Sequence, residues 1–265
     1  MLETSEPYYL SLGEGRFKST IQAQGAWNPN EQHMAPVTGL LTHLIETFQP
    51  KPQLRISRIS FEILGLIPGG EFQVRLGILR PGRTIELVQA EMSVDGRACV
   101  IARAWRLEAA DTSGISATND EPMASHTKTN RDWDLGDWPG GYIHSIRARL
   151  LPDHEPGRGR AWLSTEHPLL GGVHVSDMAR LLGLVDTSNG IATLVPAGPG
   201  SWAFPNVDLQ IHLYREPTGE WLGLQNSVSF GTEGVGLTSS VLHDEVGPFG
   251  RAEQILTLRR IPPLN

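Results

Sequence analysis

Long stretches of this chain alternate apolar and polar residues, the pattern of β-strands that bury one face. Two segments, 36–46 and 175–186, instead space their apolar residues as a helix does, and Ser176 is placed to cap the second. One helix among many strands in each half predicts an α+β fold in which a sheet wraps a helix. The predicted strands are 8–10, 17–24, 54–66, 71–79, 83–94, 98–107, 142–151, 160–165, 203–214, 221–230, 236–243 and 251–259.

The order of these elements occurs twice, about 150 residues apart, which indicates a tandem duplication. Glu71-Phe72 and Glu220-Trp221 hold corresponding places after a proline turn in the two copies. The segment between the copies is rich in Ser, Thr, Asn, Asp and Ala, a composition typical of linkers. We therefore predict a first unit over 1–107, a linker over 108–137 and a second unit over 138–265.

Composition excludes several classes of function. The net charge of −7 argues against non-specific nucleic-acid binding, which needs a basic surface. No apolar run reaches the roughly 20 residues of a membrane span, and the first residues, MLETSEPYYL, lack a secretory signal pattern, so we expect a cytoplasmic protein. The single cysteine, Cys99, excludes an internal disulfide. The nine histidines show no metal-ligand spacing, and no nucleotide-binding or serine-hydrolase motif is present, so we predict no metal and no cofactor.

The best candidate chemistry lies in the second copy. Both predicted helices end in an acid, Glu46 and Asp186, although a helix dipole disfavours negative charge at that end. Only the second copy adds two amides, Asn206 and Gln254, on its later strands. Because buried amides and carboxylates need hydrogen-bond partners, we expect these three side chains to gather around one water molecule. The corresponding positions of the first copy are Ser57 for Asn206 and Ala102 or Arg103 for Gln254.

Five short segments occur in a familiar order: Leu79-Arg80-Pro81-Gly82-Arg83, Val185-Asp186, Asn206-Val207-Asp208, Glu220-Trp221 and Gln254. Over nearly the whole chain this order resembles the double-hotdog acyl-CoA thioesterases of the thioesterase II type. The resemblance implies two fused hotdog units and hydrolysis of an acyl-CoA thioester to acid and CoA. In that pattern an Asp, a Thr and a Gln hold the attacking water. Asp186 and Gln254 match it, and Asn206 stands in place of the Thr.

The same resemblance places Arg80 and Arg83 at the mouth of the CoA site. His33, just before the first helix, and Trp202 are further candidates for substrate contact. Asp186 would act as the base, with its pKa raised in a dry site. Backbone N–H groups at the start of a helix, at 172–175 or 32–34, would stabilise the oxyanion. The expected partner is acyl-CoA, and fused hotdogs of this kind are expected to associate into homo-oligomers.

Two alternatives remain open at this point. A non-catalytic acyl-CoA or fatty-acyl binding protein could share the fold, since fold does not fix function. A hotdog hydratase would use an Asp and a His that lie close together on a loop, and the sequence shows no such loop.

Overall fold

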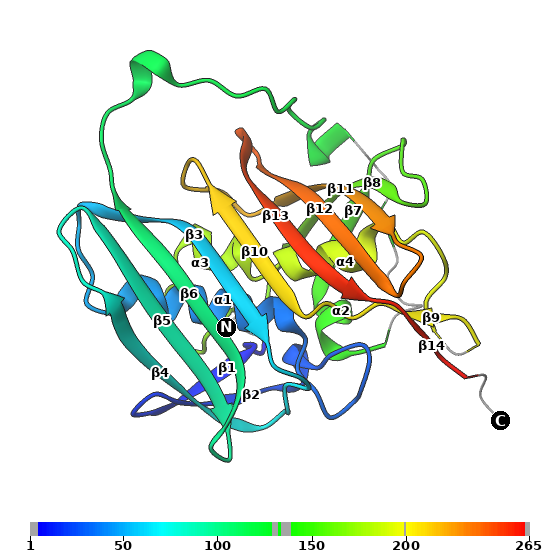
Figure 1. The fold of residues 1–265 in the computed structure, drawn as a ribbon, viewed down its shortest axis with the longest axis horizontal. Helices are drawn as coiled ribbons and strands as arrows, with labels where there is room; N and C mark the ends of the chain where they lie inside the picture. The colour runs from blue at the N-terminus through cyan, green and yellow to red at the C-terminus, as the bar shows by residue number, and fades with distance from the viewer. Residues whose placement is uncertain (1–4, 129–131, 134–138, 199, 263–265) are drawn as a thin grey trace.

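A computed structural model of the chain describes residues 5–128, 132–133, 139–198 and 200–262. Its main feature is a twelve-stranded antiparallel sheet that curves around the helices (Figure 1). The first half supplies β1 (Tyr9–Gly13), β2 (Arg16–Ser19), α1 (Met34–Thr47), β3 (Leu54–Ile63), β4 (Glu71–Arg80), β5 (Ile85–Val94) and β6 (Arg97–Glu108). The second half supplies α2 (Gly141–Ser145), β7 (Ile146–Leu150), β8 (Arg158–Thr165), α3 (Asp177–Leu182), α4 (Ser188–Ile191), β10 (Asp208–Leu213), β11 (Leu222–Phe230), β12 (Val235–Asp244) and β13 (Gly247–Thr257).

The order of the strands shows the duplication directly. From the central β3–β10 pair outward, the sheet runs β3, β6, β5, β4, β2, β1 on one side and β10, β13, β12, β11, β8, β7 on the other. At the centre, Ile59 of β3 lies opposite Ile211 of β10 in antiparallel register. This arrangement is a double hotdog of the α+β class, as the sequence predicted, and it makes one continuous sheet from the two halves.

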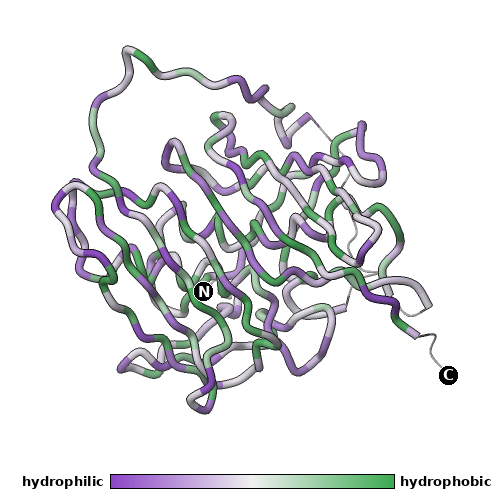
Figure 2. The backbone as a smooth tube through the Cα atoms, viewed as in Figure 1, coloured by the Kyte–Doolittle hydropathy of each residue, from purple (hydrophilic) through white to green (hydrophobic). Residues whose placement is uncertain are grey.

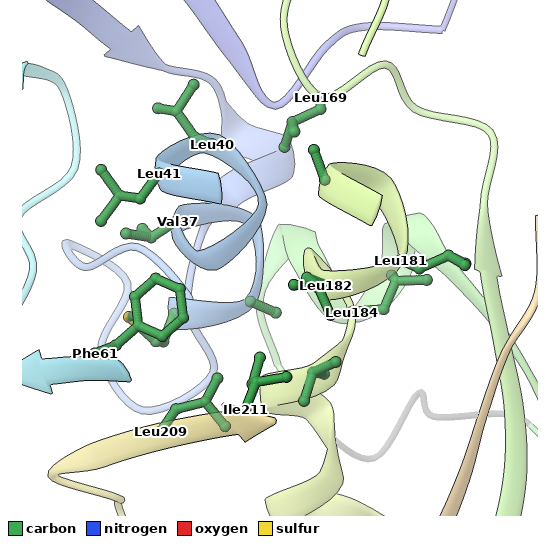
Figure 3. Close-up of a cluster of buried hydrophobic side chains, with 14 of the residues drawn as sticks. Val37, Leu40, Leu41, Phe61, Leu169, Leu181, Leu182, Leu184, Leu209 and Ile211 are labelled. Atoms are coloured by element: carbon green, nitrogen blue, oxygen red, sulfur yellow. The ribbon is translucent and has the colours of Figure 1, made fainter. Parts of the chain in front are cut away.

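Alternating hydropathy along the strands, visible in Figure 2, turns the apolar residues of the sheet toward the helices. Between the two halves, α1 and α3 pack against each other, and Phe61 of β3 and Leu209 and Ile211 of β10 belong to the same buried cluster (Figure 3). The buried side chains of this centre are Val37, Leu40, Leu41, Phe61, Leu169, Leu181, Leu182, Leu184, Leu209 and Ile211. Cys99 is also buried, in agreement with the apolar run that surrounds it.

The helices approach closely because glycines face each other at their crossing. A Cβ added to Gly39 of α1 would lie 2.8 Å from the carbonyl oxygen of Ala179 and 2.9 Å from Cα of Gly183. We therefore expect Gly39→Ala to lower the free energy of unfolding by about 1–3 kcal/mol, the usual cost of overpacking. Gly77→Ala on β4 is the control, since a Cβ there meets no atom within 4 Å. Urea titrations that give both variants the same stability would contradict this explanation of the crossing.

Most element boundaries shift by a few residues from the sequence-based ones, and four differences change the kind of structure within a predicted element. The strand predicted over 17–24 ends at Ser19, because the Thr20 side chain caps a 3-10 turn over Ile21–Ala23. The region 142–151 begins with the short helix α2 before β7. The strand predicted over 203–214 is interrupted at Pro205, which has no N–H to give to a ladder. Its first part, β9 (Trp202–Ala203), pairs with β14 (Arg259–Arg260) in a separate two-stranded sheet.

The fourth difference bears on the candidate site. The helix predicted over 175–186 is confirmed at its start, where Ser176 Oγ accepts from the N–H of Ala179, but it ends at Leu182. Gly183 follows at the crossing with α1, and a 3-10 turn over Val185–Thr187 leads into α4. Asp186 therefore lies in this turn and not at the end of a longer helix.

The segment after β6 crosses outside the sheet to the second half (Figure 1). Its later part packs there: Met123 joins a small buried cluster with Trp162, whose indole N–H donates to the carbonyl of Ala124 at 2.8 Å. The predicted boundary between residues 137 and 138 lies outside the described residues. No helix in the described part of the chain has both the length and the apolar character to cross a membrane.

Candidate active site

Asp186, Asn206 and Gln254 lie in direct contact. Oδ1 of Asp186 accepts a hydrogen bond from Asn206 Nδ2 and another from Gln254 Nε2, each at 2.8 Å. Ser188 Oγ donates to Gln254 Oε1 at 2.5 Å, so the amide group of Gln254 is held with its NH₂ toward the carboxylate. Asp186 is 6% exposed and Gln254 1% exposed. The three polar tips expected from the sequence are thus brought together, in a largely dry environment.

Each of these side chains comes from a different element. Asp186 projects from the 3-10 turn, Asn206 from the segment after Pro205, and Gln254 from the centre of β13. Asn206 Nδ2 also donates to the carbonyl of Asp208 at 3.0 Å, which fixes it at the start of β10. The second half alone therefore builds the trio.

The first half contributes His33, which caps α1. Its Nδ1 accepts the N–H of Ala35 at 3.1 Å and lies 3.5 Å from Oδ2 of Asp186. The ring packs on Tyr142, with centroids 4.2 Å apart, and Tyr142 shares a hydrogen bond of 2.6 Å with the hydroxyl of Thr187. Because Nδ1 accepts a hydrogen bond, the proton of the neutral ring is assigned to Nε2.

Burial controls the charge of both groups. It raises the pKa of Asp186 to about 6, against the opposing effect of the two amide hydrogen bonds. It lowers the pKa of His33 to about 3. At neutral pH the site therefore holds a carboxylate beside a neutral imidazole, and the carboxylate is unusually ready to take up a proton.

Two cavities meet at this carboxylate. The smaller, about 50 Å³, extends beneath Ile143, Ile191 and Phe204. The larger, about 480 Å³, extends past the start of α1 to Arg259. Both are lined by Ala26, Trp27, His33, Asp186 and Asn206. Among the described residues, no group of three or more His, Cys, Asp or Glu side chains could hold a metal ion.

Because its pKa is raised, Asp186 should make the free energy of unfolding depend on pH. The folded state binds the Asp186 proton more tightly than the unfolded state, so this residue lowers stability as pH rises from about 4 to about 6. The cost above that window is about 3 kcal/mol. Asp186→Asn should therefore unfold like the wild type at pH 4 and be more stable by up to that amount at pH 8. Denaturant titrations at both pH values measure it, and an equal difference at the two values would contradict it.

Family models match both halves of the chain. The family described as acyl-CoA thioesterase N-terminal domain matches residues 23–107, and the acyl-CoA thioesterase C-terminal domain matches residues 120–258, more than half of the chain. The chain belongs to the acyl-CoA thioesterase family. A search of curated proteins found no match.

Solved structures share the fold of this thioesterase family member at low sequence identity. A hot dog fold protein of unknown function from Alicyclobacillus acidocaldarius has a TM-score of 0.74 and 12% identity, over 94% of this chain and 95% of that one. An acyl-CoA thioesterase II from Mycobacterium marinum has a TM-score of 0.68 and 15% identity, over 97% and 96%. The dehydratase domain of curacin polyketide synthase has a TM-score of 0.53 and 13% identity, over 98% and 99%.

Not every substrate contact expected from the thioesterase resemblance reaches the site. Arg80 and Arg83 are exposed at the β4–β5 hairpin, and Arg80 donates to the carbonyl of Ile85 at 2.5 Å. Lys51, which follows α1, donates to the carbonyl of Gly82 in the same hairpin at 3.0 Å. The hairpin therefore lies near the C-terminal end of α1, about 20 Å along the helix from His33.

Of the other expected substrate contacts, some line the cavities at Asp186 and some do not. Trp202 lies in β9 with the Arg260 guanidinium 5.0 Å above its ring, and it lines neither of the cavities at Asp186. Residues 32–34 line the larger cavity, whereas 173–175 line a separate one. Sequence reasoning missed Arg259 as a cavity residue. Its position depends on the short β9–β14 pairing, which the sequence pattern did not predict.

Proposed function

We propose that this chain hydrolyses acyl-CoA thioesters to free acid and CoA, with Asp186 as the general base. The observation that carries the proposal is that the two oxygens of the Asp186 carboxylate have different partners. Asn206 and Gln254 both bind Oδ1, which leaves Oδ2 to accept a proton from a water molecule. Membership of the acyl-CoA thioesterase family supports the same chemistry.

The reaction needs little more than this arrangement. Water held at Oδ2 attacks the thioester carbon while its proton passes to Asp186. The tetrahedral intermediate then collapses, the C–S bond breaks, and the departing thiolate takes up the proton held by Asp186, which restores the carboxylate as the acid forms. A base with a pKa of about 6 is ionised at pH 7 and still basic enough to accept the proton. The two amides contribute by fixing the orientation of the carboxylate.

The start of α1 supplies the electrostatic stabilisation. Met34 is the first residue of a 14-residue helix, and an N–H at that position has no carbonyl partner within the helix. Met34 lines the larger cavity together with His33. Its N–H and the positive end of the helix dipole are therefore suited to bind the oxyanion. Of the two segments expected from the sequence, 32–34 is the one that we propose.

Arg259 is the cation that we propose for the CoA phosphates. It lines the larger cavity, next to Thr257 and Ile261, and Arg260 follows it on β14. Guanidinium groups bind phosphate oxygens through paired hydrogen bonds, so a small basic segment can recruit an anion despite the net charge of −7.

The proposed function is tested by release of free thiol from acyl-CoA esters ranging from acetyl to palmitoyl. We expect turnover of at least one ester, with kcat/KM rising tenfold per pH unit below about pH 6 and level above it, as ionisation of Asp186 requires. Binding of these esters in calorimetry without any thiol release would instead support the non-catalytic acyl-CoA binding protein.

One observation favours a second candidate, reversible hydration of an enoyl thioester. The sequence showed no Asp and His close together on a loop, but the fold brings His33 of the first half within 3.5 Å of Asp186. A carboxylate beside an imidazole could move protons on an acyl chain. The loss of enoyl absorbance during incubation with crotonyl-CoA, without release of thiol, would favour this candidate over hydrolysis.

A further inference from the structure

The two cavities at Asp186 differ about tenfold in size, at about 50 and 480 Å³. A thioester that reaches this carboxylate must extend away from it in two directions, toward the acyl group and toward the CoA arm. The CoA arm is long and ends in a nucleotide, so only the larger cavity can take it. The smaller cavity is left for the acyl group.

We propose, on the basis of the hydrolase function above, that this smaller cavity is the acyl pocket and that it restricts the substrate to short acyl chains. An apolar cavity of about 150 Å³ binds benzene, which has six carbons, so about 50 Å³ accommodates on the order of two carbons beyond the thioester carbonyl. Beyond the carbonyl an acetyl group has one carbon and a butyryl group three, close to this limit, whereas an octanoyl chain has seven and exceeds it.

Hydrogen bonds and ring contacts hold the walls of the pocket in place, so the pocket cannot easily widen to accept a longer acyl chain. Asn189 Nδ2 donates to the carbonyl of Phe204 at 2.9 Å and ties α4 to the opposite wall. Asn226 Nδ2 donates to the carbonyl of Ser188 at 2.8 Å and ties α4 to β11. The Phe204 ring lies between Trp27 and Phe230, with centroids 6.0 and 5.8 Å away. Widening the pocket would break contacts on several sides.

Two residues of α4 allow the pocket to be changed in opposite directions. Gly190 lines the cavity, and a Cβ added there meets no atom within 4 Å, so Gly190→Val fills space without a clash at that atom. Ile191 lines the same cavity and is 2% exposed, so Ile191→Ala enlarges it. Their matched controls are Gly77→Val, also with open space at Cβ, and Ile59→Ala, at a fully buried position of β3.

The experiment measures kcat/KM for acetyl-, butyryl- and octanoyl-CoA. In the wild type we expect butyryl-CoA to exceed octanoyl-CoA by at least about tenfold, since misfitting methylenes in a rigid apolar pocket cost that much. Gly190→Val should lower the butyryl/acetyl ratio and Ile191→Ala should raise the octanoyl/butyryl ratio, each about tenfold. Gly77→Val and Ile59→Ala should leave both ratios unchanged. Ile191→Val gives the same direction with a smaller change if Ile191→Ala does not fold.

Octanoyl-CoA turned over as well as butyryl-CoA by the wild type would overturn the assignment of the pocket, and so would ratios that move equally in the controls. A failure of the proposed hydrolase function can be distinguished from a failure of the pocket assignment. If no ester releases thiol, calorimetric titration of the three esters into Asp186→Asn still reads the size limit, and tighter binding of octanoyl- than of butyryl-CoA would overturn it.

Discussion

Replacing Asp186 by Asn is expected to lower thiol release from acyl-CoA by a factor of about 10²–10⁴, the usual contribution of a general base. Asn keeps an oxygen that can accept from Asn206 and Gln254, so the hydrogen-bonded frame around Oδ1 is retained. It cannot take the proton of the attacking water. The loss should therefore appear in kcat, with near-wild-type binding of substrate in calorimetry.

The chain itself provides the matched control in Glu46, the acid that ends α1 in the first half. Ser176 Oγ donates to Glu46 Oε2 at 2.6 Å, so this carboxylate supports the cap of α3. Glu46→Gln should keep most of the activity. A Glu46→Gln variant as impaired as Asp186→Asn, or an Asp186→Asn variant with full turnover, would remove Asp186 from its proposed role.

Replacing Arg106 by Met should lower the free energy of unfolding by about 3–5 kcal/mol, more than the other substitutions proposed above. Arg106 is 3% exposed and Glu86 is fully buried, and they pair at 3.0 Å. The guanidinium also donates to the carbonyl of Phe48, at 2.8 Å, and to that of Ile45, at the end of α1. Methionine fills similar space but leaves the Glu86 carboxylate, among the described residues, with Lys51 as its one cationic partner, at 2.5 Å. It also leaves the helix carbonyls without this donor.

Differential scanning calorimetry measures this change as a fall in Tm on the order of 10 °C. Arg103→Met is the control, since Arg103 lies on the same strand but is exposed and donates to Gln89 at 3.0 Å. Its stability should stay within about 0.5 kcal/mol of the wild type. Equal losses in the two variants would show that the cost comes from the strand and not from the buried pair.

The sequence alone predicted the fold and the three polar side chains that meet at the Asp186 carboxylate. Hydrophobic period and repeated element order predict the two helix-wrapping halves, because both features depend on local pattern. Comparison of the copies then singles out Asn206 and Gln254 as amides that only the second half adds to its acid, Asp186. Their hydrogen bonds agree with the expectation that buried polar groups satisfy one another.

What the sequence could not show depends on contacts between distant segments. Gly183, the C-cap of α3, lies at the close approach to Gly39, a residue of the other half, and this contact cannot be seen in the sequence. The approach of His33 to Asp186 follows from the packing of α1 beside the 3-10 turn. Arg80 and Arg83 lie at the far end of α1 although the resemblance placed them at the CoA site, because a motif match does not carry the direction in which a hairpin extends.

The mirrored strand order gives this chain the approximate symmetry of a dimer, but its two halves need not have the same sequence. In a dimer of identical subunits, a substitution at one of two symmetry-related positions appears at both. Here the corresponding positions are separate codons, so one acid could become a structural support, Glu46 beside Ser176, while the other stayed buried next to two amides. Fusion of the halves thus permits one specialised centre per molecule, at which the opposite half contributes a helix start and an imidazole.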